Sequence, residues 1–311
     1  MPDGAARATQ AHQAGRRQFT VSLSKLDCYR SCRRQYFYRY MVRAKPLIQS
    51  ATLLYGITVH EAIEGFLTEG ADPVEQFKAA WAQRLNSEPV QFTKTMGPED
   101  LTAVGELSLK RFVQWWHDSG LMVALMPDGQ PMVELNLAAR IHEDLILWGK
   151  IDLVAIDQND RVLILDNKTP ATPCGDDFPL VADQLTDYQV LVEANGESLG
   201  LDGVDAMGYI ELVKKKVPKS ARGEGPQIHL STLAPARTDD QKRAWLGKVV
   251  NDVHDIRRGI FPKDPGPAFR SACDMCDFRT HCLYGLTDGL VIPDDRREIL
   301  ARGPRELPLS L

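Results

Sequence analysis

Two acidic residues and a lysine stand close together in residues 148–170, WGKIDLVAIDQNDRVLILDNKTP. Asp152 lies within an apolar run, and Asp166 precedes Lys168 by two positions. A carboxylate on the buried side of a strand is costly unless a cation or a hydrogen-bond donor accompanies it. Two such carboxylates on adjacent strands, beside an ammonium group, predict a divalent-metal site for phosphodiester cleavage.

A β-hairpin is predicted to position these groups. Period-two alternation places Asp152 on the face opposite three apolar residues, Ile151, Leu153 and Ala155. Residues 158–160 are good turn formers. One face of the second strand then carries Val162, Ile164, Asp166 and Lys168. The alternative is an ordinary hairpin with a solvated aspartate and an Asp–Lys ion pair, because Asp-x-Lys is a short pattern.

His60 and Glu134 are further candidates outside the hairpin. Residues 51–69 predict a glycine turn followed by a helix, with His60 on a face away from the apolar stripe. Residues 131–141 predict a strand in which Glu134 lies among apolar residues as a third acid. A lone helical histidine is usually structural, so its interpretation depends on what the fold places beside it.

The rest of the chain predicts helices and strands around the hairpin. Residues 178–195 predict a helix on which Gln184 and Tyr188, one turn apart, point the same way. Ser24 is predicted to cap a helix that contains Phe37. We expect further helices at 72–86, 99–119 and 238–259, strands at 204–216 and 227–233, and loops at 87–98 and 217–226.

Five of the six cysteines are candidates for a second metal site. The tail at 261–285 is rich in Pro and Gly and contains a C-x2-C-x5-C spacing made by Cys273, Cys276 and Cys282. This spacing lets three thiolates turn onto one metal and leaves one position, which Cys28 or Cys32 can fill. In a chain expected in the cytoplasm, metal binding explains such cysteines better than disulfides do.

Basic and aromatic residues are interleaved just after Cys32. Arg33, Arg34, Tyr36 and Arg39 belong to this segment, and such side chains together suit phosphate contact and base stacking. A core-facing aromatic stripe with a solvated basic face explains the aromatic residues equally well.

Length and composition limit the class of protein. The chain has 311 residues, 43% hydrophobic and 25% charged, which are ordinary values for one large or two small globular domains. Its net charge of -5 does not indicate nucleic-acid binding, although a bound metal would restore positive potential locally. No apolar run reaches the ~20 residues that span a bilayer. Residues 1–17 lack a signal-peptide core, so we expect a disordered leader and a cytoplasmic protein without a membrane partner.

In their order along the chain, these motifs resemble the PD-(D/E)XK nuclease superfamily, in particular its RecB-type branch. That family has a helical His, an Asp strand, (D/E)-x-K and a Gln-x3-Tyr helix, matched here by His60, Asp152, Asp166-Asn167-Lys168, and Gln184 with Tyr188. The resemblance covers residues 20–285 and includes the G-x-(I/V)-D context of Asp152, but the proline of the family's name is missing. No G-x4-G-K-(S/T) motor motif is present, which indicates a nuclease without a helicase.

The resemblance implies a restriction-endonuclease-like α/β core with a mixed central sheet flanked by helices. It implies one nuclease domain at 18–285, with a helical part at 18–125, a catalytic core at 126–260 and a cluster-binding tail at 261–285, before an extension at 286–311. It further implies that Mg²⁺ or Mn²⁺ is held by His60, Asp152, Asp166 and the carbonyl of Asn167. Lys168 would orient water or steady transition-state charge, Gln184 and Tyr188 would position Lys168 and the DNA backbone, and Glu134 would support the ligands.

The cysteines resemble those of iron–sulfur nucleases in this branch, such as AddB-type nuclease domains and CRISPR-adaptation exonucleases. This implies a four-iron four-sulfur cluster on Cys32, Cys273, Cys276 and Cys282, with Cys32 preferred because it directly precedes the aromatic-basic segment. The implied activity is a metal-dependent DNA exonuclease acting on single strands or free ends, in recombination, repair or CRISPR-type processing with a matching protein partner. The alternatives are a non-catalytic DNA-binding or assembly protein of the same fold, and a zinc-ribbon protein with an unrelated core.

Overall fold

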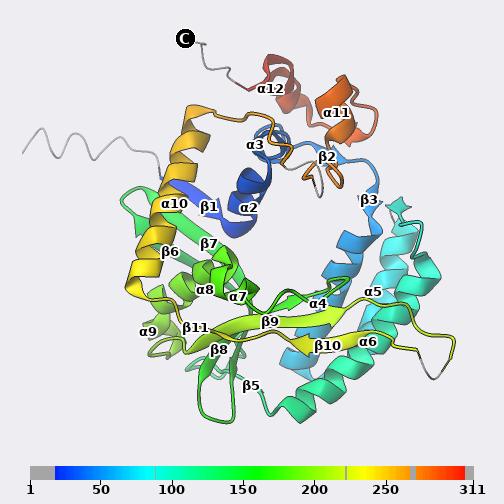
Figure 1. The fold of residues 1–311 in the computed structure, drawn as a ribbon, viewed down its shortest axis with the longest axis vertical. Coiled ribbons are helices and arrows are strands. Elements are labelled where there is room, and N and C mark those ends of the chain that lie inside the picture. Colours follow the sequence, from blue (N-terminus) through cyan, green and yellow to red (C-terminus); the bar gives the residue numbers. More distant parts are fainter. Residues whose placement is uncertain (1–17, 88, 221–222, 267–270, 305–311) are drawn as a thin grey trace, which may run out of the picture.

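Strand β7 (Leu145–Ile156) is the longest strand of a mixed sheet in the computed structural model (Figure 1). The structure describes residues 18–87, 89–220, 223–266 and 271–304. Helices cover both faces of the sheet, so the predicted α/β fold class with a central mixed sheet is confirmed. The expected disordered leader at 1–17 lies outside the described residues, and no helix among the described residues is long and apolar enough to cross a membrane.

The two edges of β7 are paired differently. Strand β6 (Val133–His142) runs antiparallel along one edge. The other edge is shared by β1 (Phe19–Ser22), which ends opposite Trp148, and β8 (Val162–Lys168), whose pairing begins at Leu153. Within the described chain, residues 149–152 therefore have no strand partner on that edge, and Asp152 lies in this gap.

The remaining strands extend the sheet or form small pairs beside it. In the sheet, β8 pairs with β9 in parallel. Both β10 and β11 pair with β9 in the antiparallel direction, and β5 pairs antiparallel with β7. Their bounds are β5 (Met122–Val123), β9 (Ala206–Val213), β10 (Gln227–Leu230) and β11 (Ala234–Pro235). Two separate pairs join β2 (Lys45–Pro46) to β12 (Leu290–Val291), and β3 (Gln49–Ser50) to β4 (Val90–Gln91). The predicted loop at 87–98 thus contains a short strand, and part of the predicted C-terminal extension pairs with the N-terminal part.

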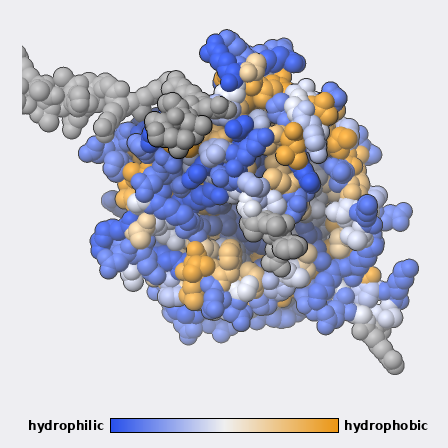
Figure 2. All heavy atoms as spheres, turned by 45° about the horizontal axis from the view of Figure 1, so that its top comes forward, coloured by the Kyte–Doolittle hydropathy of each residue, from blue (hydrophilic) through white to orange (hydrophobic). Residues whose placement is uncertain are grey.

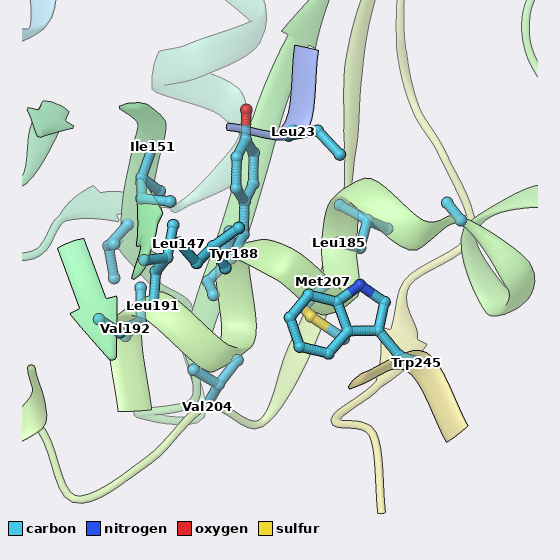
Figure 3. Packing of buried hydrophobic residues seen from close by; sticks show 14 of the residues in the cluster. Leu23, Leu147, Ile151, Leu185, Tyr188, Leu191, Val192, Val204, Met207 and Trp245 are labelled. Atoms are coloured by element: carbon cyan, nitrogen blue, oxygen red, sulfur yellow. The ribbon is translucent and has the colours of Figure 1, made fainter. Parts of the chain in front are cut away.

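Two groups of helices sandwich the sheet, seen on the right and the left of Figure 1. One group packs against Leu153, Leu165 and Ile210 and consists of α4 (Ala51–Glu69), α5 (Pro73–Ser87) and α6 (Pro98–Ser119). The other packs against Leu147 and Ile164 and consists of α2 (Leu23–Ser31), α8 (Asp183–Ala194) and α10 (Asp239–Arg258). Figure 3 shows this second core, in which side chains of β7 and α8 lie in one cluster with Met207 of β9 and Trp245 of α10. Shorter elements are α3 (Arg33–Tyr36), a π-helix at Phe37–Met41, α7 (Phe178–Val181), α9 (Gly196–Leu199), α11 (Arg279–Tyr284), a 3-10 helix at Asp294–Arg296 and α12 (Arg297–Arg302).

Several predicted helices differ from the structure at their ends. The predicted cap at Ser24 is wrong, because Ser22 stands at the N-cap and the helix begins at Leu23. The helix ends before Cys32, whose φ of -160° and ψ of 113° are extended. The helix expected at 178–195 breaks at Ala182, where ψ is 116°. The glycine turn expected at the start of 51–69 is wrong, because α4 continues through Gly56. A Cβ on Gly56 would lie 3.4 Å from Thr169 Oγ1, an ordinary contact distance, so α4 packs against the end of β8 at this point.

The predicted hairpin is confirmed, but its side-chain alternation is not regular. Ile151 packs in the same core as Val154, whereas Leu153 packs in the opposite one, so the predicted common face is wrong for Ile151. Alternation therefore shifts between Ile151 and Val154, where Asp152 lies. Glu134 lies opposite this point in β6 and has a φ of 53°, which is unusual for a residue other than glycine. Such local strain is often found at functional sites.

Candidate active site

Three candidate metal ligands meet at the gap beside β7. His60 comes from α4, Glu134 from β6 and Asp152 from β7, and one donor atom of each lies within 4.8 Å of the others. His60 Nδ1 is 3.4 Å from Asp152 Oδ2 and 3.8 Å from Glu134 Oε1. One nitrogen and two carboxylate donors suit a divalent cation. Glu134, expected only to support the ligands, is placed as close to the centre as the other two.

Asp152 also connects the two strands of the hairpin. Its Oδ2 accepts a hydrogen bond of 2.9 Å from the backbone N–H of Asn167, across the place where the β7–β8 ladder has ended. Asn167 is buried, and its side-chain Oδ1 has no hydrogen-bond partner among the described residues. The hydrogen bond from Asn167 holds the backbone of β8 next to His60, Glu134 and Asp152, which are called the His60 group below.

Asp166 is held by three side chains that the sequence analysis singled out. Its Oδ1 accepts hydrogen bonds from Gln184 Nε2 and Tyr188 Oη, both at 3.0 Å. Its Oδ2 lies 2.5 Å from Lys168 Nζ. Figure 3 shows the Tyr188 ring rising from the apolar core with its hydroxyl at the far end. Gln184 and Tyr188 do point the same way, as their spacing predicts, and they contact Asp166.

The carboxylates and cations of the site shift one another's pKa values. Burial raises the pKa of Asp152 to about 7, and the neighbouring charge of Asp166 adds to this rise. Burial lowers the pKa of His60, but the carboxylates around it, Glu134 foremost, raise it overall. Burial also lowers the pKa of Lys168, and the charge of Asp166 more than reverses this. Burial therefore penalises the charged form of Asp152 more than the neighbouring cations stabilise it, and a metal cation fits such a site.

Cavities open on both sides of this centre. One of about 530 Å³ is lined by His60, Glu134 and Asp152 on the α4 side. Another of about 700 Å³ is lined by Lys168 and Gln184 on the α7 side. Thr169, which follows β8, lines both cavities, so the end of β8 lies between them.

Two residues of the candidate active site, Lys150 and Thr169, were not predicted from the sequence. Lys150 forms an ion pair with Glu134 Oε2, and Thr169 contributes to both cavities. Lys150 lies within the Gly149–Asp152 motif and alternates with Asp152 along β7, which is a signal that could have pointed to it. Thr169 carries no such signal, because its place depends on the close packing of α4.

The cysteine segments from the two ends of the chain lie together. Cys28 and Cys32 are buried, and Cys276 and Cys282 pack against the same aromatic cluster as Cys28. Burial raises the pKa of the Cys276 thiol, and Cys32 and Cys273 are close enough to raise it further. Among the described residues, these thiols do not converge within 4.8 Å as the His60 group does. Figure 2 turns this side of the molecule forward and shows apolar patches between hydrophilic ones.

The predicted nucleic-acid segment is largely occupied by contacts within the protein. Tyr36 is buried and lies 5.4 Å from Tyr29 between ring centroids, as the core-facing alternative predicts. Arg34 Nε donates to the carbonyl of Phe261, and Arg39 forms an ion pair of 2.8 Å with Asp277. A further residue of the segment, Arg33, lies over the Tyr29 ring at 5.5 Å.

Comparison with known proteins matches most of the chain to a family. A family model described as the PD-(D/E)XK nuclease superfamily matches residues 20–283. Among solved structures, one described as "Crystal structure of SSO0001" is similar over 91% of this chain and 95% of its own, with 12% sequence identity and a TM-score of 0.39. No curated protein matches the chain.

Proposed function

The chain belongs to the PD-(D/E)XK nuclease superfamily, and we propose that it hydrolyses phosphodiester bonds of DNA with a metal held in the gap beside β7. The observation that carries this proposal is the meeting of His60, Glu134 and Asp152 from three separate elements. These donors fit Mg²⁺ or Mn²⁺, and the imidazole nitrogen makes Mn²⁺ more competitive than in an all-oxygen site. When bound, the metal polarises the scissile phosphate and activates water.

Asp166 and the carbonyl of Asn167 complete the proposed ligand set. Asp166 is near enough to Asp152 to raise its pKa, which supports a shared cation. The hydrogen bond from Asn167 N–H to Asp152 keeps this part of β8 beside the centre. Glu134 joins this set as a ligand or, through its ion pair with Lys150, as the group that holds His60 in place.

Lys168 acts in this proposal as a cation and not as a base. The carboxylate of Asp166 raises the pKa of Lys168 above its ordinary value, so its amine remains protonated at neutral pH. A protonated amine at this position orients water and stabilises the charge that develops on the phosphate. Gln184 and Tyr188 are positioning residues, because their hydrogen bonds fix the carboxylate of Asp166.

The motif order supports a narrower function, that of a RecB-type exonuclease acting on single strands or free ends. In this proposal the enzyme acts in recombination, repair or CRISPR-type processing, with a protein partner from that process. The second candidate is a DNA-binding or assembly protein that keeps the fold with an idle site. The complete set of Asp152, Asp166 and Lys168 favours catalysis over this second candidate.

The proposal is tested with end-labelled single-stranded and duplex DNA. We expect degradation from the ends with Mg²⁺ or Mn²⁺ and none in EDTA. Circular single-stranded DNA is the matched substrate without ends, and cleavage of circles at the same rate would contradict the exonuclease assignment. Full activity in EDTA would contradict the metal-dependent one.

We also propose that Cys32, Cys273, Cys276 and Cys282 bind a four-iron four-sulfur cluster. Soft thiolate donors suit such a cluster, and the packing of both cysteine segments on one aromatic cluster supports it. The β2–β12 pair and the Arg39–Asp277 ion pair hold the same two segments together. The cluster would be structural and would close the loop between the ends of the chain.

Serine substitutions at the four cysteines test the cluster. Each is expected to remove iron and the absorption near ~400 nm and to lower the melting temperature by several degrees, because ligation closes a long loop. Cys174→Ser, outside the cluster, is the matched control and should keep both properties. If Cys28→Ser loses the colour and Cys32→Ser keeps it, the fourth ligand is Cys28. A protein that carries zinc after anaerobic purification would contradict the cluster.

A further inference from the structure

The cavity of about 700 Å³ beside Lys168 is not used by the proposed chemistry. It is bounded by the ends of β8 and β9 and by α7, and its lining combines the aromatic rings of Phe178 and Tyr209 with several carboxylates. We propose that this cavity binds an unpaired nucleobase of the strand being cleaved, with Phe178 as the stacking surface. The inference rests on the proposed nuclease function and names the form of its substrate.

Phe178 is held as a platform and is not buried in the core. Its ring stacks on Tyr209 with a centroid distance of 5.8 Å and an interplanar angle of 28°. Tyr209 is 2% exposed, whereas Phe178 is 49% exposed although it lines the cavity. A rigid support beneath one ring and open space beside that ring suit a base, and aromatic rings stack with any of the four bases.

One neighbour of Phe178 strengthens the case for a ligand. Val181 is 75% exposed and lines the same cavity. Clusters of exposed apolar side chains mark binding surfaces more often than single ones do. The cluster lies beside Lys168, whose Nζ is 5.8 Å from the centre of the Tyr209 ring. A base on Phe178 would therefore belong to a nucleotide near the reacting phosphate.

The charge of the lining favours a base over a phosphate. Asp27 and Glu211 line the cavity together with Asp183, which is paired with Arg30 and Lys248. The cation among the described lining residues, Lys168, is paired with Asp166. A phosphate would meet like charge there, whereas the amino groups of a base are hydrogen-bond donors that carboxylates accept. Glu211 is 2% exposed and fixed, because Oε1 accepts the N–H of Cys174 at 2.8 Å and Oε2 lies 3.0 Å from His229 Nδ1.

Only an unpaired base can enter such a cavity. In a duplex both faces of a base are covered by its neighbours and its edge by its partner, so the base must first leave the stack. The volume is within the usual range of small-ligand pockets. The cavity thus predicts a preference for single strands and frayed ends over intact duplex.

Phe178→Ala tests the inference, with Leu180→Ala as the matched control. Leu180 lies on the same helix and is similarly exposed, but it does not line the cavity. We would measure binding of single-stranded oligonucleotides in EDTA, with 2-aminopurine at successive terminal positions as a reporter of stacking. We expect Phe178→Ala to weaken binding about tenfold and to lose the quenching at one position. Phe178→Trp and Leu180→Ala should retain both.

An oligonucleotide that is abasic at the quenched position separates stacking from folding effects. Wild-type protein should bind it about tenfold more weakly, and Phe178→Ala should bind it as it binds the intact strand. Equal losses in Phe178→Ala and Leu180→Ala, or unchanged quenching in Phe178→Ala, would overturn the base site. If such a result accompanies normal metal-dependent cleavage by the wild type, the proposed function stands without the base site. Quenching that depends on Phe178 in a protein without nuclease activity would support the base site and overturn the proposed function.

Discussion

Asp166 and Asp187 are each 1% exposed, yet their surroundings differ. Asp166 accepts two side-chain hydrogen bonds and lies beside Lys168. Neither carboxylate oxygen of Asp187 accepts a hydrogen bond of normal geometry from the described residues. Burial alone therefore does not identify a catalytic acid. Donors arranged around a carboxylate fix its orientation, and these donors distinguish the centre at Asp166.

The region around Asp187 has another purpose, which is to join helices. Arg30 of α2 forms ion pairs with Asp183 of α8 at 2.7 Å and with Asp252 of α10 at 2.6 Å. Lys248 of α10 also pairs with Asp183. Arg30 is thus shared between two other carboxylates and compensates Asp187 only in part. The ion pairs of Arg30 and Lys248 thus connect α2, α8 and α10, whereas the charged groups around Asp166 can bind a cation.

The largest expected effect comes from replacing the two acids by their amides. Asp166→Asn keeps an acceptor for Gln184 and Tyr188 but removes the negative charge, so we expect at least about 100-fold lower nuclease activity with little change in melting temperature. Asp187→Asn is the matched control and should retain activity. Release of acid-soluble nucleotides measures the rate. Comparable activity in the two variants would remove the distinction between the two acids.

Lys168→Met is expected to have a smaller but still large effect. Its charge is proposed to act mainly in the transition state, so kcat should fall about 30-fold while DNA affinity in EDTA stays within a few-fold. Single-turnover rates and equilibrium binding separate the two quantities. Lys214→Met is a control, because Lys214 is a partly buried lysine that also lies over an aromatic ring, that of Tyr55. Equal losses of binding and rate in Lys168→Met would indicate that Lys168 anchors a phosphate.

Local sequence patterns were sufficient for most elements but not for their long-range pairing. The hairpin and the helices α4, α5, α6 and α10 follow from the periodicity of their apolar residues, such as Trp245, Val249 and Ile256 in α10. Strand β1 was missed because its four residues, Phe19–Ser22, gain their partner far along the chain in β7. The break at Cys32 was missed because that residue takes an extended conformation within a helical pattern.

The site shows the same division between local and long-range information. The i, i+4 spacing of Gln184 and Tyr188 correctly predicts that they point together. The approach of His60 and Glu134 depends on how α4 packs across β6, which no local pattern records. The left-handed φ of Glu134 is likewise a product of the folded sheet and could not be read from its neighbours. The candidate side chains could therefore be predicted from the sequence, but which of them lie together depends on the folded sheet.

The smallest expected effect is in stability and concerns the pH dependence of Asp187. Burial raises the pKa of Asp187 well above its ordinary value, and Arg30 and the Trp245 side chain offset only part of this rise. The folded protein then holds this proton more tightly than the unfolded chain does. The contribution of Asp187 to the free energy of unfolding is therefore greatest below the unfolded pKa of about 3.9 and declines as pH rises toward the raised pKa.

Asp187→Asn replaces the titrating carboxyl group by a neutral amide of the same shape. We expect it to raise the free energy of unfolding by about 1–3 kcal/mol at pH 8, because the wild-type acid there is either ionised while buried or protonated at a free-energy cost. At pH 4 we expect the free energy of unfolding to change little. Urea unfolding at the two pH values measures the difference, with the exposed Asp288→Asn as a control that should show none. A loss of stability at pH 8 would mean that Arg30 stabilises Asp187 as an anion. Asp187 would then be a second paired carboxylate like Asp166, and the arrangement of donors would no longer separate the two regions.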